Sequence, residues 1–548
     1  MAEDVRREPL RALTDGAPDR HDLCIGLVAP IGSSRDQVLT DLGSRLTQYG
    51  YGMERIRLAD LLQATPGDPP LPLRGEKDYH RLRMNAGDAL RHTTGDDSAV
   101  AALGIARVAK MREDRADRKD AGEGVEPMVY VFDSLKHPRE ARLLRNVYGP
   151  GFWLVSIVQD IEEREQNLAD TLASQLKTFS GSDAPGLDEL IRRDQGDPED
   201  KSGQQVRDVF AEADYFLPVR RGVSWTDHVE RFLAGVFDAP FITPAQDEDA
   251  MRHAKAASLR SAALSRQVGA VVVPPGGDPY LLGTNEVPKP GGGQFREGDS
   301  PDFRDFQTGY DPNPTYVDRL LGEVFERLAA AGYFNDERNA SGGATVLKEA
   351  RSKRGGQPAV LDGIRATALI EFTRCLHAEQ AAIASAARTG VAVSGATLYS
   401  TTFPCHECTK IIVGAGIIEV KYIEPYPKSM AGELYRDLID AVPPMDTPSQ
   451  TTAEMTRVPF RPFLGFGPGR YDEVFAAGRR RDGTRAAEHK KLDACPIGRG
   501  WSEIAVKANE DEVVVAFAVA SNQQVPVSEP SKSGSAGDSQ SDVVGSAT

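Results

Sequence analysis

Two short segments near the end of the chain constrain its fold most strongly, because both carry metal-ligating residue types. His377 and Glu379 stand in LHAEQ, and Cys405 follows His377 by 28 positions in PCHEC, which ends at Cys408. Pro404 suits the first turn of a helix, where the helix dipole favours thiolates. A fold that brings His377 beside this turn would surround one metal ion with an imidazole and two thiolates.

This ligand set has the composition of a catalytic zinc site. Two cysteines and one histidine leave the fourth position of a zinc ion to water, whose pKa the ion lowers to roughly 7. HxE followed by PCxxC is the signature of zinc deaminases, in which hydroxide attacks C4 of cytosine and ammonia leaves. We therefore predict that His377, Cys405 and Cys408 bind zinc and that Glu379 is the catalytic proton carrier.

Each half of the pattern has a simpler interpretation when it stands alone. A CxxC pair often forms a structural zinc corner or a redox pair, and HxE is often a surface pattern. A structural site would have no use for Glu379. We expect His406 and Glu407 to be solvated, and Cys375 to be a small buried residue rather than a fourth ligand.

Length and patterning divide the chain into two α/β units. Apolar runs at 128–133, 152–158 and 213–219 alternate with helical patterns, which is typical of a parallel sheet. A second series begins with a helix predicted over 247–266. The predicted domains are 23–240 and 245–520, with an insertion at 288–357 and disordered ends at 1–22 and 521–548, whose composition cannot offset the entropy of ordering.

The loop after the first predicted strand lies where a phosphate-binding loop belongs. Its sequence departs from a full P-loop, because Ser33 and Ser34 follow Gly32 directly and the phosphate-binding lysine is missing. Asp133 ends a predicted strand and is either a magnesium ligand or a helix cap. We predict a regulatory, P-loop kinase-like parallel-sheet domain, in which Gly26, Gly32, Ser33, Ser34 and Asp133 bind a nucleotide with Mg²⁺.

The formal net charge of −16 limits the partners. Such a field repels a phosphate polymer, so contact with nucleic acid would need a local basic patch, and small nucleotides fit better. The sequence holds no apolar run long enough to cross a bilayer. We expect a cytoplasmic protein without membrane contact.

Residues 247–477 resemble the deoxycytidylate deaminase branch of the cytidine deaminase superfamily. The matching pieces include GTNEVP, CLHAEQAAI and GATLYSTTFPCHECTKIIVGAGIIEVKYIEPYPKS. The resemblance implies a three-layer α/β/α fold and an oligomer. It also implies that Asn285 contacts the nucleotide, that Thr402 and Phe403 line the base pocket, and that Tyr426 faces the nucleotide. A turn residue after a strand is the alternative interpretation of Asn285.

The fusion of a degenerate kinase-like domain to such a deaminase resembles the bacterial anti-phage deoxycytidine nucleotide deaminases. This second resemblance implies that dCTP or dCMP is deaminated to starve phage replication, and that a regulatory nucleotide, an RNA or a phage-derived trigger controls activity. A housekeeping enzyme that supplies dUMP is the first alternative. A polynucleotide-editing deaminase, or a signalling NTPase with the deaminase fold as a scaffold, are the others.

Overall fold

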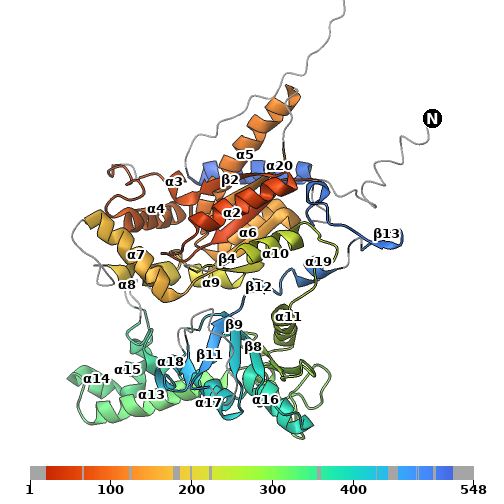
Figure 1. Ribbon diagram of the computed structural model, residues 1–548. Helices are drawn as coiled ribbons and strands as arrows, with labels where there is room; N and C mark the ends of the chain where they lie inside the picture. Colours follow the sequence, from red (N-terminus) through yellow and green to blue (C-terminus); the bar gives the residue numbers. More distant parts are fainter. Residues whose placement is uncertain are drawn as a thin grey trace, which may run out of the picture.

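The computed structural model describes residues 20–64, 67–121, 126–176, 186–197, 200–220, 225–353, 359–426, 429–441, 455–476, 478, 480–497 and 502–521. These residues form two α/β units, one above the other in Figure 1, each around a six-stranded sheet. Apart from residues 20–22 and 521, the ends predicted to be disordered lie outside the described residues. The five residues 354–358 at the end of the predicted insertion also lie outside them.

The N-terminal sheet has the strand order β12-β5-β4-β1-β3-β2, and every pairing except that of β12 with β5 is parallel. Alternate strand residues contribute to two separate cores, because successive side chains of a strand point to opposite faces. Helices α5, α6 and α9 cover one face, and α2 and α10 cover the other. The bounds are β1 (Leu23–Val28), α2 (Asp36–Leu46), β2 (Gly52–Arg57), α3 (Leu58–Leu61), α4 (Tyr79–Thr94), α5 (Ala99–Asp120), β3 (Met128–Asp133), α6 (Pro138–Tyr148), β4 (Phe152–Val158), α7 (Ile161–Leu176), α8 (Leu187–Gln195), α9 (Val206–Ala211), β5 (Tyr215–Pro218) and α10 (Thr226–Val236).

The C-terminal sheet has the order β10-β11-β9-β8-β6-β7, in which β6 runs antiparallel to both of its neighbours. Helix α11 packs on one face, while α16 and α17 pack on the other, so the unit has the expected three layers. The bounds are α11 (Gln246–Ser258), β6 (Gly269–Val273), β7 (Leu281–Thr284), α16 (Ala378–Thr389), β8 (Thr397–Thr402), α17 (His406–Gly414), β9 (Glu419–Glu424), α18 (Ala431–Leu434), β10 (Ile439–Asp440) and β11 (Val458–Pro462).

Helix α11 is shorter than the sequence pattern predicts, since it ends at Ser258 rather than Arg266. The next residues exchange helical hydrogen bonds for tertiary ones. Ser261 Oγ donates to Asn285 O at 2.7 Å, and Ala262 N donates to Glu286 Oε2 at 2.9 Å. These bonds turn the chain along the end of β7, so that the segment after α11 runs beside the zinc motifs.

The two helical layers approach the sheet at glycines. A Cβ at Gly269 in β6 would lie 1.9 Å from Ala254 O of α11, and a Cβ at Gly283 in β7 would lie 2.0 Å from Ala378 O of α16. Backbone atoms cannot rotate out of the way, so only glycine fits at these positions. The close approach of α16 sets the depth at which its first residues lie.

The insertion adds four helices beside the C-terminal sheet. They are α12 (Asp305–Thr308), α13 (Pro312–Ala330), α14 (Asp336–Ser341) and α15 (Gly343–Ala350). Val317 and Leu321 of the predicted apolar stripe are buried in a small separate core with Leu347, as expected of a packing face. Leu320 and Val324 remain 41% and 45% exposed, so the stripe is only partly covered within this chain.

The end of the chain returns to the N-terminal unit. Strand β12 (Gly465–Phe466) pairs with β5, and α20 (Glu503–Ala520) packs against α5 and α6, as the blue ribbon in the upper unit of Figure 1 shows. Arg470, just before α19 (Tyr471–Phe475), donates to Phe152 O at 2.9 Å and lies over the Trp153 ring. The domain predicted over 245–520 is therefore not one packing unit, because β12 and α20 complete the N-terminal unit instead.

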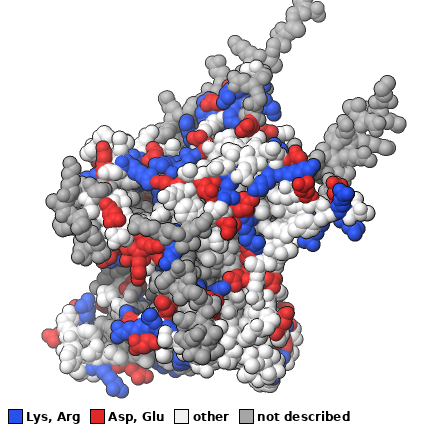
Figure 2. All heavy atoms as spheres, viewed as in Figure 1, with Lys and Arg blue, Asp and Glu red and all other residues white. Residues whose placement is uncertain are grey.

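The surface is mixed in charge. Acidic and basic side chains are interspersed over the face seen in Figure 2, where the described residues form no continuous basic stripe. Within the described part of the chain, none of the helices has both the length and the apolar character needed to span a membrane.

Candidate active site

Two helix starts meet at the centre of the C-terminal unit. His377 is the residue before α16, where Gln380 Oε1 accepts a hydrogen bond from its backbone N–H at 3.1 Å. Cys405 is the residue before α17, and Cys408 lies in the first turn. His377 Nδ1 lies 3.2 Å from Cys405 Sγ and 3.3 Å from Cys408 Sγ. The three predicted ligands are therefore brought together, although 28 residues separate the two helix starts.

This donor set fits a zinc ion. Zinc bonds of about 2.0 Å to nitrogen and about 2.3 Å to sulfur, at tetrahedral angles, place the ligand atoms about 3.5 Å apart, close to the distances observed. Among the described residues, His377, Cys405 and Cys408 are the one group of ligating side chains with all ligand atoms within 4.8 Å of one another. A hydrogen bond from Cys408, together with the adjacent His377, lowers the pKa of Cys405 to about 4 despite its burial. A group that supplies three ligands leaves a zinc coordination position for water.

Glu379 lies beside this group but is not part of it. Its side chain is 4% exposed, Oε1 accepts a hydrogen bond from Ser400 Oγ at 3.2 Å, and Oε2 lies 3.3 Å from Cys408 Sγ. Burial and the negative charge of Cys405 raise the pKa of Glu379. A buried carboxyl with a raised pKa is suited to take up a proton and to release it again.

Ser400 is a site residue that the sequence analysis missed. It is fully buried in β8 and lies two residues before Thr402, so both side chains point to the same face of the sheet. That alternation was the one available signal, since a serine in an apolar strand needs a polar partner.

A cavity of about 240 Å³ opens onto the ligand group. All four predicted substrate-binding residues, Asn285, Thr402, Phe403 and Tyr426, line it together with Glu379. The Phe403 ring packs edge-on against Tyr422, which fixes an apolar wall. The structure thus gathers the predicted residues around one space, although their roles toward a substrate stay predictions.

Asn285 also has a structural role. Its side chain accepts a hydrogen bond from Val268 N and donates one to Arg266 O, both at 2.7 Å. These bonds hold the segment between α11 and β6 against the cavity. The guanidinium of Arg266 pairs with Glu424 at 2.6 Å and lies over the Tyr426 ring, so a cation stands at this wall of the cavity.

The insertion supplies part of the cavity wall. Asp305, Asp311 and Asn313 line the same cavity from α12 and the start of α13. Asn313 Nδ2 donates to Leu369 O at 2.7 Å, and its Oδ1 accepts from Phe372 N at 3.2 Å. The insertion is thereby tied to the segment that leads into His377.

The neighbouring sulfur and imidazole groups are not part of the ligand group. Cys375 is buried, and its Sγ lies 3.5 Å from Asp305 Oδ2, while burial and Asp305 raise the pKa of its thiol. His406 lies 3.9 Å from Glu371, and Glu407 pairs with Lys410 on the surface of α17. Neither Cys375 nor His406 belongs to the metal-binding group.

The comparisons with known proteins concern this unit. Residues 244–424 match the family described as "Cytidine and deoxycytidylate deaminase zinc-binding region". The matched residues run from just before α11 to the end of β9 of the C-terminal unit. The match covers about a third of the chain and includes all three ligands and Glu379.

Curated relatives share the same region. A "Probable deoxycytidylate deaminase" of Drosophila melanogaster is 31% identical over 129 residues, which cover 23% of this chain and 59% of that protein. The "Deoxycytidylate deaminase" of Enterobacteria phage T2 is 46% identical over 57 residues, or 10% of this chain and 30% of the phage protein. The chain therefore spans less than two thirds of the length of these relatives.

Among solved structures, the dCMP deaminase of cyanophage S-TIM5 in apo form is 17% identical. The alignment covers 40% of this chain and 99% of the phage chain, with a TM-score of 0.20. The same enzyme in complex with dCMP and dUMP is 19% identical, with coverages of 36% and 93% and a TM-score of 0.20.

The N-terminal candidates lie in two different places. Gly26 is inside β1, where a Cβ would lie 2.7 Å from both Leu135 and Phe152, and it does not line the cavity of this unit. Gly32, Ser33, Ser34 and Asp133 do line that cavity, which measures about 850 Å³.

Asp133 lacks the surroundings of a magnesium ligand. Its Oδ1 pairs with Arg35 Nε and its Oδ2 with Arg55 Nε, each at 2.8 Å. Two guanidinium groups around one carboxylate leave it neutralised by cations that a metal ion would have to displace. On the sequence alone we expect Asp133 to bind Mg²⁺. Nothing in the sequence indicates its pairing with Arg35 and Arg55, because neither arginine is close to Asp133 in the chain.

Proposed function

We propose that the protein deaminates the cytosine ring of a free deoxycytidine nucleotide, dCMP or dCTP, to the deoxyuridine nucleotide. The observation that carries the proposal is the position of Glu379, a buried carboxyl beside a His-Cys-Cys group in the wall of a cavity of about 240 Å³. The match of residues 244–424 to the deaminase zinc-binding region supports it, as do the relatives named as deoxycytidylate deaminases.

The side chains divide the reaction between them. A zinc ion held by His377, Cys405 and Cys408 would supply Lewis-acid activation of the attacking water. Glu379 takes up the proton of that water and delivers it to N3 of the ring, and a second transfer through the same carboxyl releases ammonia. The hydrogen bond from Ser400 orients Oε1 of Glu379, and Oε2 lies on the side of the ligand group, 3.3 Å from Cys408 Sγ.

The cavity favours a free nucleotide over a polynucleotide. Its volume of about 240 Å³ suits a base with its sugar and lies just below the usual range for small-ligand sites. A strand-binding deaminase needs a basic path for the backbone, and the net charge of −16 on this chain opposes a bound polynucleotide. Arg266, which lines the cavity and pairs with Glu424, is the proposed contact of the 5′-phosphate.

We further propose a defensive purpose, in which deamination depletes dCTP when a phage-derived trigger releases a restraint imposed by the N-terminal unit. The presence of a second α/β unit, built around a mostly parallel sheet, in the same chain supports this proposal. The exposed part of the α13 stripe offers a surface for an oligomer.

The test is mass-spectrometric detection of deaminated product from deoxycytidine, dCMP, dCTP, CTP and single-stranded DNA. We expect product from dCMP or dCTP alone. Glu379→Gln should abolish turnover while the zinc content stays at one ion per chain. Glu433→Gln, the same change at an exposed residue of α18 that pairs with Arg365, is the matched control and should retain activity.

Two outcomes would contradict the proposal. Turnover by Glu379→Gln would remove this residue from the mechanism, and product from single-stranded DNA would overturn the argument from charge and cavity size. Measurement of dCTP pools in infected and uninfected cells separates the defensive purpose from a housekeeping supply of dUMP. The defensive purpose requires that the pool falls only after infection.

A further inference from the structure

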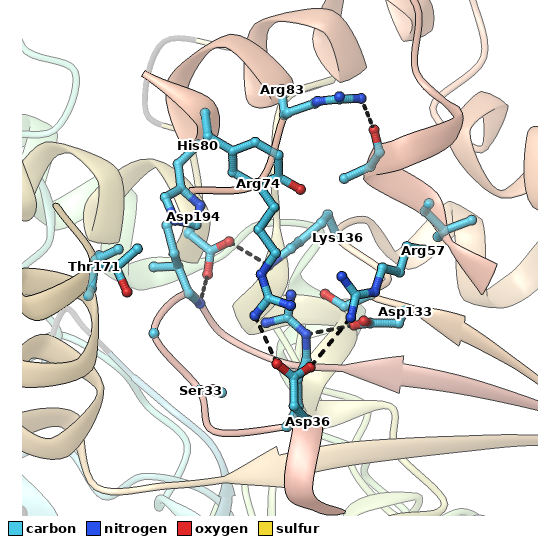
Figure 3. A pocket seen from close by; sticks show the side chains of 18 of the residues that line it. Ser33, Asp36, Arg57, Arg74, His80, Arg83, Asp133, Lys136, Thr171 and Asp194 are labelled. Atoms are coloured by element: carbon cyan, nitrogen blue, oxygen red, sulfur yellow. Dashed lines mark hydrogen bonds and ion pairs between the residues drawn. The ribbon is translucent and has the colours of Figure 1, made fainter. Parts of the chain in front are cut away.

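A second cavity lies in the N-terminal unit, away from the deaminase site. It opens at the carboxyl ends of the parallel strands β1 and β3, where open α/β sheets bind ligands. Its volume of about 850 Å³ falls within the range of sites for organic ligands. Figure 3 shows that its labelled side chains come from the loop after β1, the start of α2, the ends of β2 and β3 with the segments after them, and helices α4, α7 and α8.

The side chains that line this cavity carry a net positive charge, whereas the whole chain is negative. Among the described residues that line it, seven are arginine or lysine and three are aspartate, in a chain with a net charge of −16. His80 lies among these cations. Burial, followed by Lys136 and Arg35, lowers the pKa of His80 to about 4, so it adds no positive charge at neutral pH. The cavity is therefore a local site of positive potential, which attracts anions.

The cations are held by carboxylates of the chain itself. Arg74 Nη2 donates to Asp36 Oδ2 at 2.9 Å, and Arg55 Nη1 pairs with Asp36 Oδ1 at 2.7 Å. Arg74 extends through the cavity to reach Asp36 in Figure 3, although half of its side chain is exposed. Burial opposes ionisation of Asp36, but hydrogen bonds from Arg74 and Arg55 lower its pKa to about 2. Asp36 is thus a resident anion at the mouth of the cavity.

A second carboxylate, from α8, lies against the loop that follows β1. Asp194 of α8 is buried, its Oδ1 accepts from Lys136 Nζ and its Oδ2 accepts from Ile31 N, both at 2.7 Å. Ser34 N donates in the same way to Gln159 Oε1 at 2.8 Å. Backbone N–H groups and a lysine around one anion are the groups that bind phosphate in other loops. Here the chain supplies the anion.

We propose that this cavity binds an oligophosphate, free or carried by a nucleoside, through arginine and lysine side chains and without a magnesium ion. Arg57 and Arg74 contact the phosphates, and the ligand displaces Asp36 from Arg74. Lys136 stays paired with Asp194 and adds its charge from the side of the loop. Guanidinium groups bind phosphate oxygens in pairs and keep their charge at every physiological pH. We expect no magnesium ion, because Asp133, the carboxylate at the end of β3, is already paired with Arg35 and Arg55 and is not available as a metal ligand.

The experiment is isothermal titration of the full-length, zinc-loaded protein with inorganic tripolyphosphate, ATP and adenosine, in buffer with and without Mg²⁺. We expect the affinity for tripolyphosphate to be the same with and without Mg²⁺, and likewise the affinity for ATP. Adenosine should bind at least 100-fold more weakly than ATP. Tighter binding of ATP than of tripolyphosphate would identify a nucleotide as the natural ligand, and equal binding a free oligophosphate. A requirement for Mg²⁺, or no binding of either phosphate compound, would overturn the proposal.

Two variants with opposite expected effects test the assigned contacts. Arg74→Ala should weaken tripolyphosphate binding at least tenfold, while Asp36→Asn should strengthen it, because its cations are released for the ligand. Arg319→Ala, at an exposed arginine of α13, is the matched control and should change nothing. Equal affinities of the Arg74 and Asp36 variants would refute the assignment.

The inference stands apart from the deaminase function. Saturating dCMP should leave tripolyphosphate affinity unchanged, and displacement by dCMP would refute a separate site. Turnover of dCMP is measured on its own, so a failure of one proposal does not imply a failure of the other.

Discussion

Replacement of Gly283 by alanine probes how the sheet positions the zinc-binding helix. The added Cβ would lie 2.0 Å from Ala378 O and 2.4 Å from Ala382 N. Both are backbone atoms of α16, so no side-chain rotation relieves the overlap. Restoring an ordinary contact of 3.4 Å would need a separation of about 1.4 Å between β7 and α16.

Either way of relieving the overlap disturbs the site. A shift of α16 moves His377 and Glu379 away from the cysteines of α17. A shift of β7, an edge strand, moves Asn285, which directly follows it. A displacement of about 1 Å can cost ~10²-fold in rate, and overpacking costs about 1–3 kcal/mol of stability. We expect dCMP deamination by Gly283→Ala to fall about 100-fold, with weaker retention of zinc.

The assay pairs deamination rate with zinc content and thermal unfolding. Gly276→Ala, in the turn before β7, is the matched control, because a Cβ there meets no atom within 4 Å. It should behave as the unchanged protein does. If Gly283→Ala keeps full activity and zinc, the close approach of strand and helix does not position the ligands, and the reasoning is refuted.

Three further changes probe other parts of the structure. Ser400→Ala should lower kcat about tenfold without loss of zinc, since Glu379 loses the hydrogen bond that orients it; an unchanged pH profile and kcat would exclude this role. Burial raises the pKa of Glu510 from a usual value of 4.5 to about 7, although Arg112 attracts its charged form. The free energy of unfolding therefore falls as the pH rises from about 4.5 to 7, by up to about 3 kcal/mol. Glu510→Gln should therefore raise the Tm at pH 8 but not at pH 4.5, whereas Glu503→Gln, at an exposed position of the same helix, should change neither. Arg470→Ala should lower the urea midpoint, because it leaves the Phe152 and Pro150 carbonyl groups without their donor at a cost of about 3 kcal/mol.

The zinc ligands could be predicted because their chemistry is local in sequence. The short spacing within HAE and PCHEC places each set at a helix start, and the intervening strand has an apolar run of its own. The strands at 128–133 and 152–158 could be predicted for the same reason, since each is a short apolar run bounded by turn residues. Elements whose signals lie within their own few residues can therefore be predicted from the sequence.

Contacts between distant segments could not be predicted in this way. The helical pattern continues beyond Ser258, yet α11 ends there because Ser261 and Ala262 find partners around β7. Helix α20 is apolar on several sides, and nothing in its own sequence indicates that α5, nearly 400 residues earlier, is its partner. Asn313 reaches the active-site cavity only because the insertion folds back onto the segment before His377.

The N-terminal cavity shows most clearly where sequence patterns end. The loop sequence located the site, since Gly32, Ser33 and Ser34 line it. The missing lysine showed only that the loop departs from a full P-loop, because the P-loop pattern counts only residues within the loop. In the folded chain Lys136, from the segment after β3, donates to Ala29 O at the start of this loop. Arg74, from the segment before α4, donates to Asp36 at the end of the loop. A charge that a motif lacks can be supplied by any part of the chain that folds against it, so the absence of a motif residue says little about the potential inside a cavity.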